Sequence, residues 1–285
     1  EPQRYAEQRL EGMVIQGRLQ RAQGNVDGSI ATYEVALRER TALSGHNHPE
    51  TAGLYNSLAI AYMASSRFNE AMSAYTQALG IHEALGRADD VDASIMRANV
   101  GILAIRYGQI DDAEKWLRTG FERQQALSGD SAAVAAALGY YASLLSLRGK
   151  HEEAMETLRN SLRMAAQFAG PASPVAVLNR LFLAEAHAAS GDTKAALALL
   201  DENLALARKQ LGEKSAFVLR TEVSRSRLSL ASGSDADAAR ADSELAGVIT
   251  RLRAIGVTGV PVLAQALVAR GEALLAQGRS ADAVP

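Results

Sequence analysis

The sequence contains no cysteine, and it has only 6 prolines and 5% aromatic residues among 285 positions. Without cysteine, the chain cannot form disulfides, thiolate metal sites or a cysteine nucleophile. The scarcity of aromatic residues does not favour a β-sandwich, a β-barrel or a base-stacking surface. A low proline content is instead typical of a helical chain.

Neither sign of charge dominates, since 30 Lys and Arg residues face 32 Asp and Glu residues for a net charge of -2. This balance indicates neither a nucleic-acid partner nor an anionic membrane surface. Two uncharged stretches, 131–147 and 254–269, fall short of the roughly 18 to 20 residues that cross a bilayer. We therefore expect no membrane insertion in this chain.

The sequence is built from a repeat of about 42 residues. A short turn that ends in Ala or Ser recurs at steps of 41 to 45 residues, at Ser29, Ala71, Ala113, Ala154, Ala196, Ala238 and Ala283. A glycine that we predict to end a helix keeps the same period, at Gly45, Gly86, Gly129, Gly170, Gly212 and Gly256. Each repeat thus predicts two helices, as in residues 56–64 and 70–79, joined by a tight turn.

Small and large residues alternate between the two predicted helices of a repeat. The small ones are expected where first helices are approached closely, at Gly17, Ala59, Gly101, Ala142, Ala184 and Gly271. The large ones fill the space from second helices, at Tyr33, Tyr75, Leu117, Leu158 and Leu200. In the sixth repeat Asp242 and Leu245 replace the expected packing residues, so we expect it to be the least regular.

These residues resemble the tetratricopeptide repeat, most closely at Leu58, Ala59, Tyr62, Phe68, Ala71, Tyr75, Ala78 and Leu79. The 42-residue period and the segment Gly45-His46-Asn47-His48-Pro49 are similar to the kinesin-light-chain type. The resemblance implies an all-α fold, a right-handed superhelical solenoid of antiparallel helix pairs. It predicts a single array over residues 1–285, with units 3–45, 46–86, 87–129, 130–170, 171–212, 213–256 and a truncated 257–285.

Signatures of catalysis and of metal binding are missing. The chain has no HExxH, GxSxG, GxxxxGK(S/T) or GxGxxG motif. His46, His48 and Glu50 are too few for a metal site, which needs three or four ligands. We therefore predict no catalytic residue, no metal and no cofactor.

The remaining candidates are interpreted as structural. His82 and His151 have no evident partner, and His187 is interpreted as a packed histidine rather than a base. Trp116 is expected to pack beside Leu117. A small basic cluster is expected to be a solvated face, at Arg220, Arg225 and Arg227.

The first helices of such a superhelix line an inner groove, and the repeat period predicts which side chains face it. The predicted partner-binding residues are Asn56, Ile60, Met63, Asn99, Ile102, Ile105, Ser143, Ser146, Leu181 and Glu185. Exposed isoleucine and methionine would form a larger apolar patch than a monomer usually leaves bare. This favours a protein or peptide docked in the groove; the alternative is that another segment, or a second copy in a homodimer, covers it.

We therefore expect a non-catalytic interaction or scaffold module. Such arrays resemble the C-terminal regions of some bacterial eukaryotic-like serine/threonine kinases, which implies the extracytoplasmic (periplasmic) sensor region of an inner-membrane signalling protein. The alternative is a cytoplasmic adaptor or the sensor region of a transcriptional regulator.

Overall fold

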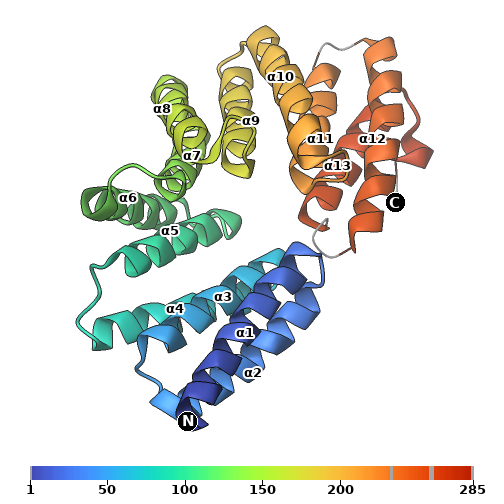
Figure 1. Ribbon diagram of the computed structural model, residues 1–285. Helices are drawn as coiled ribbons and strands as arrows, with labels where there is room; N and C mark the ends of the chain where they lie inside the picture. The colour runs from blue at the N-terminus through green and yellow to red at the C-terminus, as the bar shows by residue number, and fades with distance from the viewer. Residues whose placement is uncertain (1, 232–233, 257–259, 284–285) are drawn as a thin grey trace. The chain divides into compact units, whose positions relative to one another are not determined.

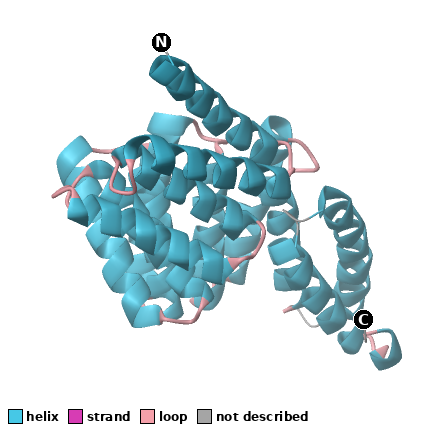
Figure 2. Cartoon of the chain, turned by 90° about the horizontal axis from the view of Figure 1, so that it is seen from below, coloured by secondary structure: helices cyan, strands magenta, loops and turns pink. Residues whose placement is uncertain are grey.

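The computed structural model describes the chain except residues 1, 232–233, 257–259 and 284–285. In this described part the protein contains thirteen α-helices, a short 3-10 helix and no strand (Figures 1 and 2). The expected all-α fold of paired helices is thus confirmed. The first residues of the seventh predicted unit, 257–259, lie outside the described residues.

The chain divides into two compact units, Glu1–Gly129 and Asp130–Pro285. Within unit 1 every helix packs against the one that follows it. Its helices are α1 (Pro2–Ala22), α2 (Val26–Ser44), α3 (Pro49–Ala64), α4 (Phe68–Ala84), α5 (Val91–Arg106) and α6 (Ile110–Ser128).

Unit 2 continues the same pattern of helix pairs. Its elements are α7 (Ala132–Leu147), α8 (His151–Ala169), α9 (Pro174–Ala189), α10 (Thr193–Leu211), α11 (Ala216–Leu230), α12 (Asp235–Ile255), α13 (Val260–Ala276) and η2 (Ser280–Asp282). Here α9 also contacts α7 and α11, and α13 also contacts α11. Successive first helices therefore lie beside one another in this unit.

Local sequence explains where the helices begin and end. Side-chain oxygens accept hydrogen bonds from first-turn amides, for example Ser131 Oγ from Val134 N at 3.2 Å. Pro49 and Pro174 occupy the first turns of their helices, where a missing N–H costs nothing. The six glycines predicted to end second helices all have φ between 67° and 96°, a left-handed region that side chains disfavour.

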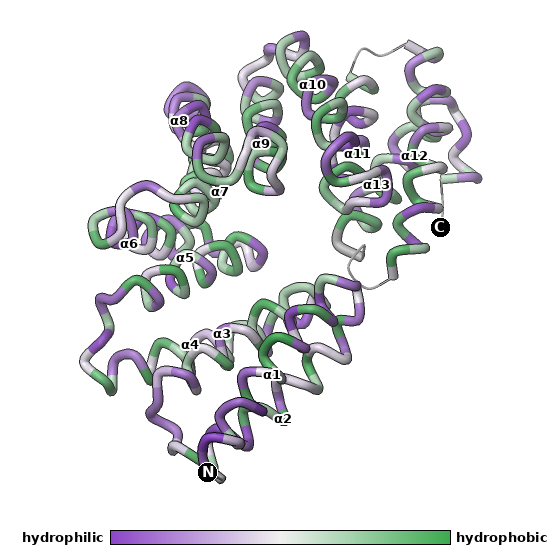
Figure 3. The backbone as a smooth tube through the Cα atoms, in the orientation of Figure 1, coloured by the Kyte–Doolittle hydropathy of each residue, from purple (hydrophilic) through white to green (hydrophobic). Residues whose placement is uncertain are grey.

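The core follows the predicted alternation of small and large residues. Tyr33, Tyr75, Leu117, Leu158 and Leu200 are all buried. Close packing explains the small partners. A Cβ atom on Gly17 would lie 2.6 Å from Tyr33 Cε1, and one on Gly101 would lie 2.6 Å from Leu117 Cγ. The first helix must therefore be bare where the second helix inserts its large side chain. Most helices accordingly carry both apolar and polar segments (Figure 3).

The sixth pair keeps a packed core and a continuous α12. Leu245, three residues after Asp242, supplies a large buried side chain there. Asp242 lies at the position that Leu200 holds in the preceding repeat. It forms ion pairs with Arg270 at 2.7 Å and Arg279 at 3.0 Å instead.

The uncharged stretch 131–147 is helix α7, which is apolar because α8 and α9 both pack against it. Among the described residues no helix combines the length and the apolar character needed to cross a membrane. Part of the other uncharged stretch, 257–259, is not described.

A buried polar ladder, which the repeat pattern did not predict, joins the helices of unit 2. Asn179 Nδ2 donates to Ala135 O at 3.2 Å and lies 2.5 Å from Ser161 Oγ. Asn203 Nδ2 repeats this arrangement one unit later, donating to Val177 O at 3.0 Å. These bonds hold α9 against α7 and α8, and α10 against α9, although the buried Asn179 Oδ1 atom accepts no hydrogen bond from any described residue.

Candidate binding surface

In unit 1 the predicted binding residues lie on α3 and α5. Asn56, Ile60 and Met63 are spaced four and three residues apart, so they share one face of α3. Asn99, Ile102 and Ile105 share one face of α5 in the same way. All six side chains are half-buried, and Ile60 and Met63 also pack against the core. The apolar face is therefore less bare than the sequence indicated.

One polar group on this face has no partner. The Oδ1 atom of Asn56 is buried and accepts no hydrogen bond from any described residue. A buried amide oxygen without a donor is destabilising by roughly 1–3 kcal/mol.

In unit 2 the predicted residues behave differently from one another. Ser143 Oγ donates to Tyr140 O at 2.8 Å, and Ser146 Oγ lies 3.2 Å from His151 Nδ1, so both hydroxyls already have partners. Leu181 is only 1% exposed and belongs to the core, so it presents no side chain to a partner. The reason is that four helices, α7, α8, α10 and α11, surround α9.

Glu185 is exposed at the edge of a cavity of about 330 Å³ between α9, α10 and α11. The cavity floor is apolar, with Ala184, Ala188 and Leu228. The surrounding helices reduce the hydration of the Glu185 carboxylate, which raises the pKa of this carboxyl. The positive charge of Arg220, a 3.4 Å hydrogen bond from Ser224 and the charge of Arg227 act in the opposite direction. An acidic group above an apolar floor can receive a hydrogen-bond donor or a cation.

The predicted basic cluster of Arg220, Arg225 and Arg227 does not form one continuous basic surface. Arg227 pairs with Glu272 at 3.2 Å, and Arg225 pairs with Asp201 at 2.6 Å. Arg220 lies over the Phe182 ring at 5.5 Å. The three guanidinium groups therefore serve different local contacts.

A charged cavity of about 380 Å³ lies between α10, α11 and α12. At its centre the Glu222 side chain, 8% exposed, accepts from Arg208 Nη2 at 2.7 Å and from Arg251 with both carboxylate oxygens. The hydrogen bond to Glu222 raises the pKa of Arg208. Since these charges satisfy one another, the cluster holds three helices together.

Glu222→Gln is expected to lower the free energy of unfolding by about 1–2 kcal/mol, because two arginines lose their shared anion but stay partly hydrated. Urea unfolding followed by circular dichroism measures the change. Glu213→Gln is the matched control. Glu213 is 61% exposed and touches the same two arginines at 3.3 and 3.6 Å, so its loss should change stability by under about 0.5 kcal/mol. Equal effects of the two variants would contradict this account.

The histidines near position 46 make local contacts within unit 1. His48 Nδ1 accepts from Glu50 N at 3.3 Å and thereby caps α3, while Glu50 pairs with Arg40. His46 packs edge-on against Tyr55 with ring centroids 5.9 Å apart. His187 is half-buried and lies 3.6 Å from an Asp192 oxygen.

His82 and His151 both differ from the expectation that they lack a partner. His82 Nδ1 lies 3.3 Å from Asp90 Oδ2, just before α5, and His151 Nδ1 lies 3.2 Å from Ser146 Oγ.

A comparison with protein families matches residues 13–84 to the tetratricopeptide repeat. No curated protein sequence matches the chain. A protein from Podosopora anserina, described as a kinesin light chain with nearly identical TPR-like repeats, is similar in structure. It has a TM-score of 0.55 and 22% identity, over 71% of this chain and 96% of that one.

Two other solved structures are similar over nearly the whole chain. The apo quorum sensor NprR from B. thuringiensis has a TM-score of 0.69 and 17% identity, over 98% of this chain and 74% of that chain. The Rap conjugation gene regulator of plasmid pLS20, in complex with the Phr* peptide, has a TM-score of 0.64 and 15% identity, over 97% and 76%. The comparisons thus show a tetratricopeptide-repeat match over residues 13–84 and, for the chain as a whole, the fold of a helical repeat protein.

Proposed function

We propose that the chain is a non-catalytic module that binds a peptide or protein segment through its first helices. The observations that carry the proposal are the two helix faces of α3 and α5, each of which presents two half-exposed apolar side chains, and the unpaired Asn56 oxygen on α3. Isoleucine and methionine would anchor apolar side chains of the ligand. Asn56 and Asn99 would pair with its backbone, as expected for a segment held in a helical groove.

In unit 2 the cavity at Glu185 offers a second contact. Its apolar floor would hold a short side chain, while the Glu185 carboxylate would receive an N–H or ammonium group. Ser143 and Ser146 line the neighbouring α7 and would contribute small polar contacts. Two structurally similar Rap proteins support a peptide as the ligand, since one structure contains the Phr* peptide and the other contains Competence and Sporulation Factor.

The module would serve as the sensing or partner-binding region of a larger bacterial signalling protein. One parent is a serine/threonine kinase receptor with this region outside the inner membrane. The alternative is a cytoplasmic adaptor or the sensor region of a regulator, and similarity to a quorum sensor and to a gene regulator favours it. Kinase peptides in the membrane fraction of source cells, captured with an antibody to this segment, would support the receptor. A soluble parent without them would support the alternative.

Ile60→Arg combined with Ile102→Arg is expected to weaken peptide binding by about 30-fold or more, because central apolar anchors contribute about 2 kcal/mol or more each. Peptides selected from a random display library against the wild-type chain serve as the probe. Their dissociation constants with wild type and variant are measured by fluorescence anisotropy.

The matched control is Leu127→Arg combined with Phe168→Arg, which adds the same two charges at exposed apolar residues of α6 and α8. This control should bind like wild type. If the Ile60 and Ile102 variant remains helical and still binds the selected peptides, the face of α3 and α5 is not the site.

A further inference from the structure

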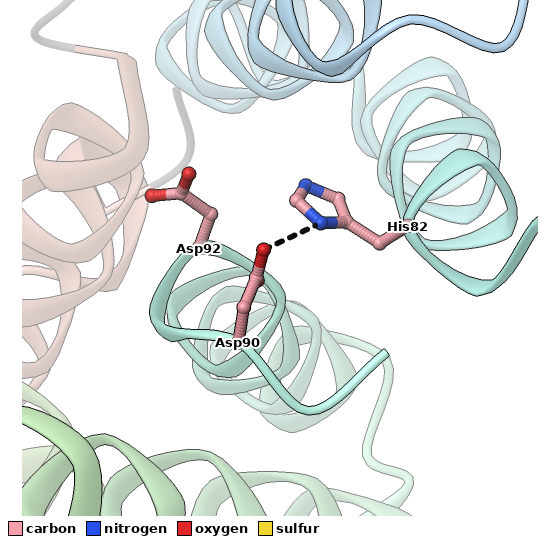
Figure 4. A group of neighbouring side chains, drawn as sticks. All are labelled: His82, Asp90 and Asp92. Carbon is pink, nitrogen blue, oxygen red and sulfur yellow. Dashed lines mark ion pairs between the residues drawn. The ribbon is translucent and has the colours of Figure 1, made fainter. Parts of the chain in front are cut away.

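Three potential metal ligands meet where α4 passes into α5 (Figure 4). His82 lies in the last turn of α4, Asp90 caps α5, and Asp92 lies in the first turn of α5. One nitrogen of His82 and one oxygen from each aspartate all lie within 4.8 Å of one another. The group belongs entirely to unit 1.

The connection between the helices fixes this arrangement. Arg87 N donates to His82 O at 2.8 Å, and Asp90 N donates to Arg87 O at 3.1 Å, so the loop folds back on the end of α4. Asp90 Oδ1 accepts from Ala93 N at 2.8 Å as the helix cap. The other oxygen, Oδ2, is left facing the imidazole.

The facing atoms have ion-pair partners but no hydrogen bonds. His82 is only 2% exposed, and its Nδ1 atom points at Asp90 Oδ2 from 3.3 Å. Neither atom forms a hydrogen bond with any described residue, although both are buried. Arg87 Nε is an ion-pair partner of Oδ2 at 3.0 Å but is not aligned for a hydrogen bond. Buried polar atoms of this kind are uncommon unless something else satisfies them.

We propose that His82 Nδ1, Asp90 Oδ2 and the Asp92 carboxylate bind a divalent transition metal ion of the Zn²⁺ class. Ligands about 2.0–2.1 Å from a tetrahedral zinc ion are about 3.4 Å apart, close to the observed separation of Nδ1 and Oδ2. Asp92 is exposed, and one of its oxygens lies within 4.8 Å of a His82 nitrogen and of an Asp90 oxygen. Water fills the fourth position.

The ligand set selects the ion. Imidazole nitrogen is a good ligand for zinc, copper, iron and nickel ions, whereas Mg²⁺ and Ca²⁺ take oxygen ligands. The ion replaces Arg87 as the counter-charge of Asp90. It links the end of one helix pair to the start of the next, and therefore stabilises unit 1. The sequence-based expectation of no metal site rested on His46, His48 and Glu50 and found no partner for His82, so the proposal departs from it. It is independent of the proposed peptide-binding face.

The test begins with the full chain freed of metal by a chelator and titrated with zinc sulfate in a calorimeter. We expect one equivalent of Zn²⁺ to bind and to raise Tm. Co²⁺ in its place should give the intense visible bands of a tetrahedral site. His82→Gln should abolish binding. Asp92→Asn should weaken binding roughly tenfold or more, since loss of groups that only hydrogen-bond to the ligands already lowers metal affinity about 10–100-fold.

Two further variants separate the metal from a simple ion pair. Asp90→Asn keeps a good helix cap but loses the charged ligand, so binding should fall while the helices remain. Arg87→Met removes the competing cation and should tighten binding, whereas a purely structural ion pair predicts no zinc response at all. His46→Ala with His48→Ala is the matched histidine control and should bind zinc like wild type.

Three results would overturn the proposal: no stoichiometric zinc in the wild-type chain, unchanged affinity in Asp92→Asn, or loss of zinc in the His46 and His48 control. Should His82→Gln fail to fold, the exposed Asp92→Asn variant decides alone, because it leaves the core untouched.

Discussion

Leu117→Ala is expected to lower the free energy of unfolding of unit 1 by about 2–5 kcal/mol. Leu117 is 0% exposed, and its side chain fills the space above Gly101, which has no side chain to replace it. The surrounding helices cannot close the cavity easily, because α5 and α6 already meet backbone to backbone at Gly120. The loss therefore includes both the transfer of the leucine from the core and the void it leaves.

Trp116, the single tryptophan, lies next to Leu117 and packs against the core of unit 1. Its fluorescence during urea unfolding reports on this unit, and circular dichroism follows both units. Leu127→Ala on the same helix is the matched control; Leu127 is 54% exposed, so a change under about 0.5 kcal/mol is expected. Similar losses in the two variants would show that burial at position 117 does not determine stability.

Glycine-to-alanine substitutions at two helical positions of unit 1 should change the free energy of unfolding in opposite directions. At Gly120 a new Cβ would lie 2.7 Å from Ala98 N and 2.9 Å from Ser94 O. These are backbone atoms of α5, so no side chain can turn aside and the two helices must separate. Gly120→Ala is therefore expected to destabilise unit 1 by about 1–3 kcal/mol, a typical cost of overpacking.

At Gly80, inside α4, a new Cβ meets nothing within 4 Å. Gly80→Ala should therefore stabilise the protein by about 0.5–1 kcal/mol, because alanine loses less backbone entropy in a helix than glycine. Thermal and urea unfolding of the two variants provide the measurement. A Gly120→Ala protein as stable as wild type would mean that α5 and α6 are not held at this distance.

The repeat period predicted the helix pairs because helix formation and helix contact obey local rules. Side chains three and four residues apart share a face, so the apolar pattern indicates which side is buried. A side chain at position 17 would collide with Tyr33, and this explains why small residues on first helices alternate in sequence with large residues on second helices. The glycines at the ends of second helices were predictable for the same reason, since backbone sterics act within a few residues.

The binding face was predictable only in part. Carrying the phase of α3 forward to α9 assumes that every first helix has the same neighbours. It places Leu181 in the groove, whereas α9 is surrounded by four helices and buries that leucine. Ile60 and Met63 are likewise more covered than their polarity pattern indicates, because they reach the core beneath them.

By itself, the sequence determined the class of fold, the helix ends and the alternation of small and large residues, all of which depend on neighbours in the chain. Tertiary structure alone decided three other features. Glu222 meets Arg251 across 29 residues, Asn179 reaches the carbonyl of Ala135, and a loop of particular shape turns His82 toward Asp90. Such contacts depend on how separate helices pack, and polar side chains can find many different partners without changing the repeat pattern that encodes the fold.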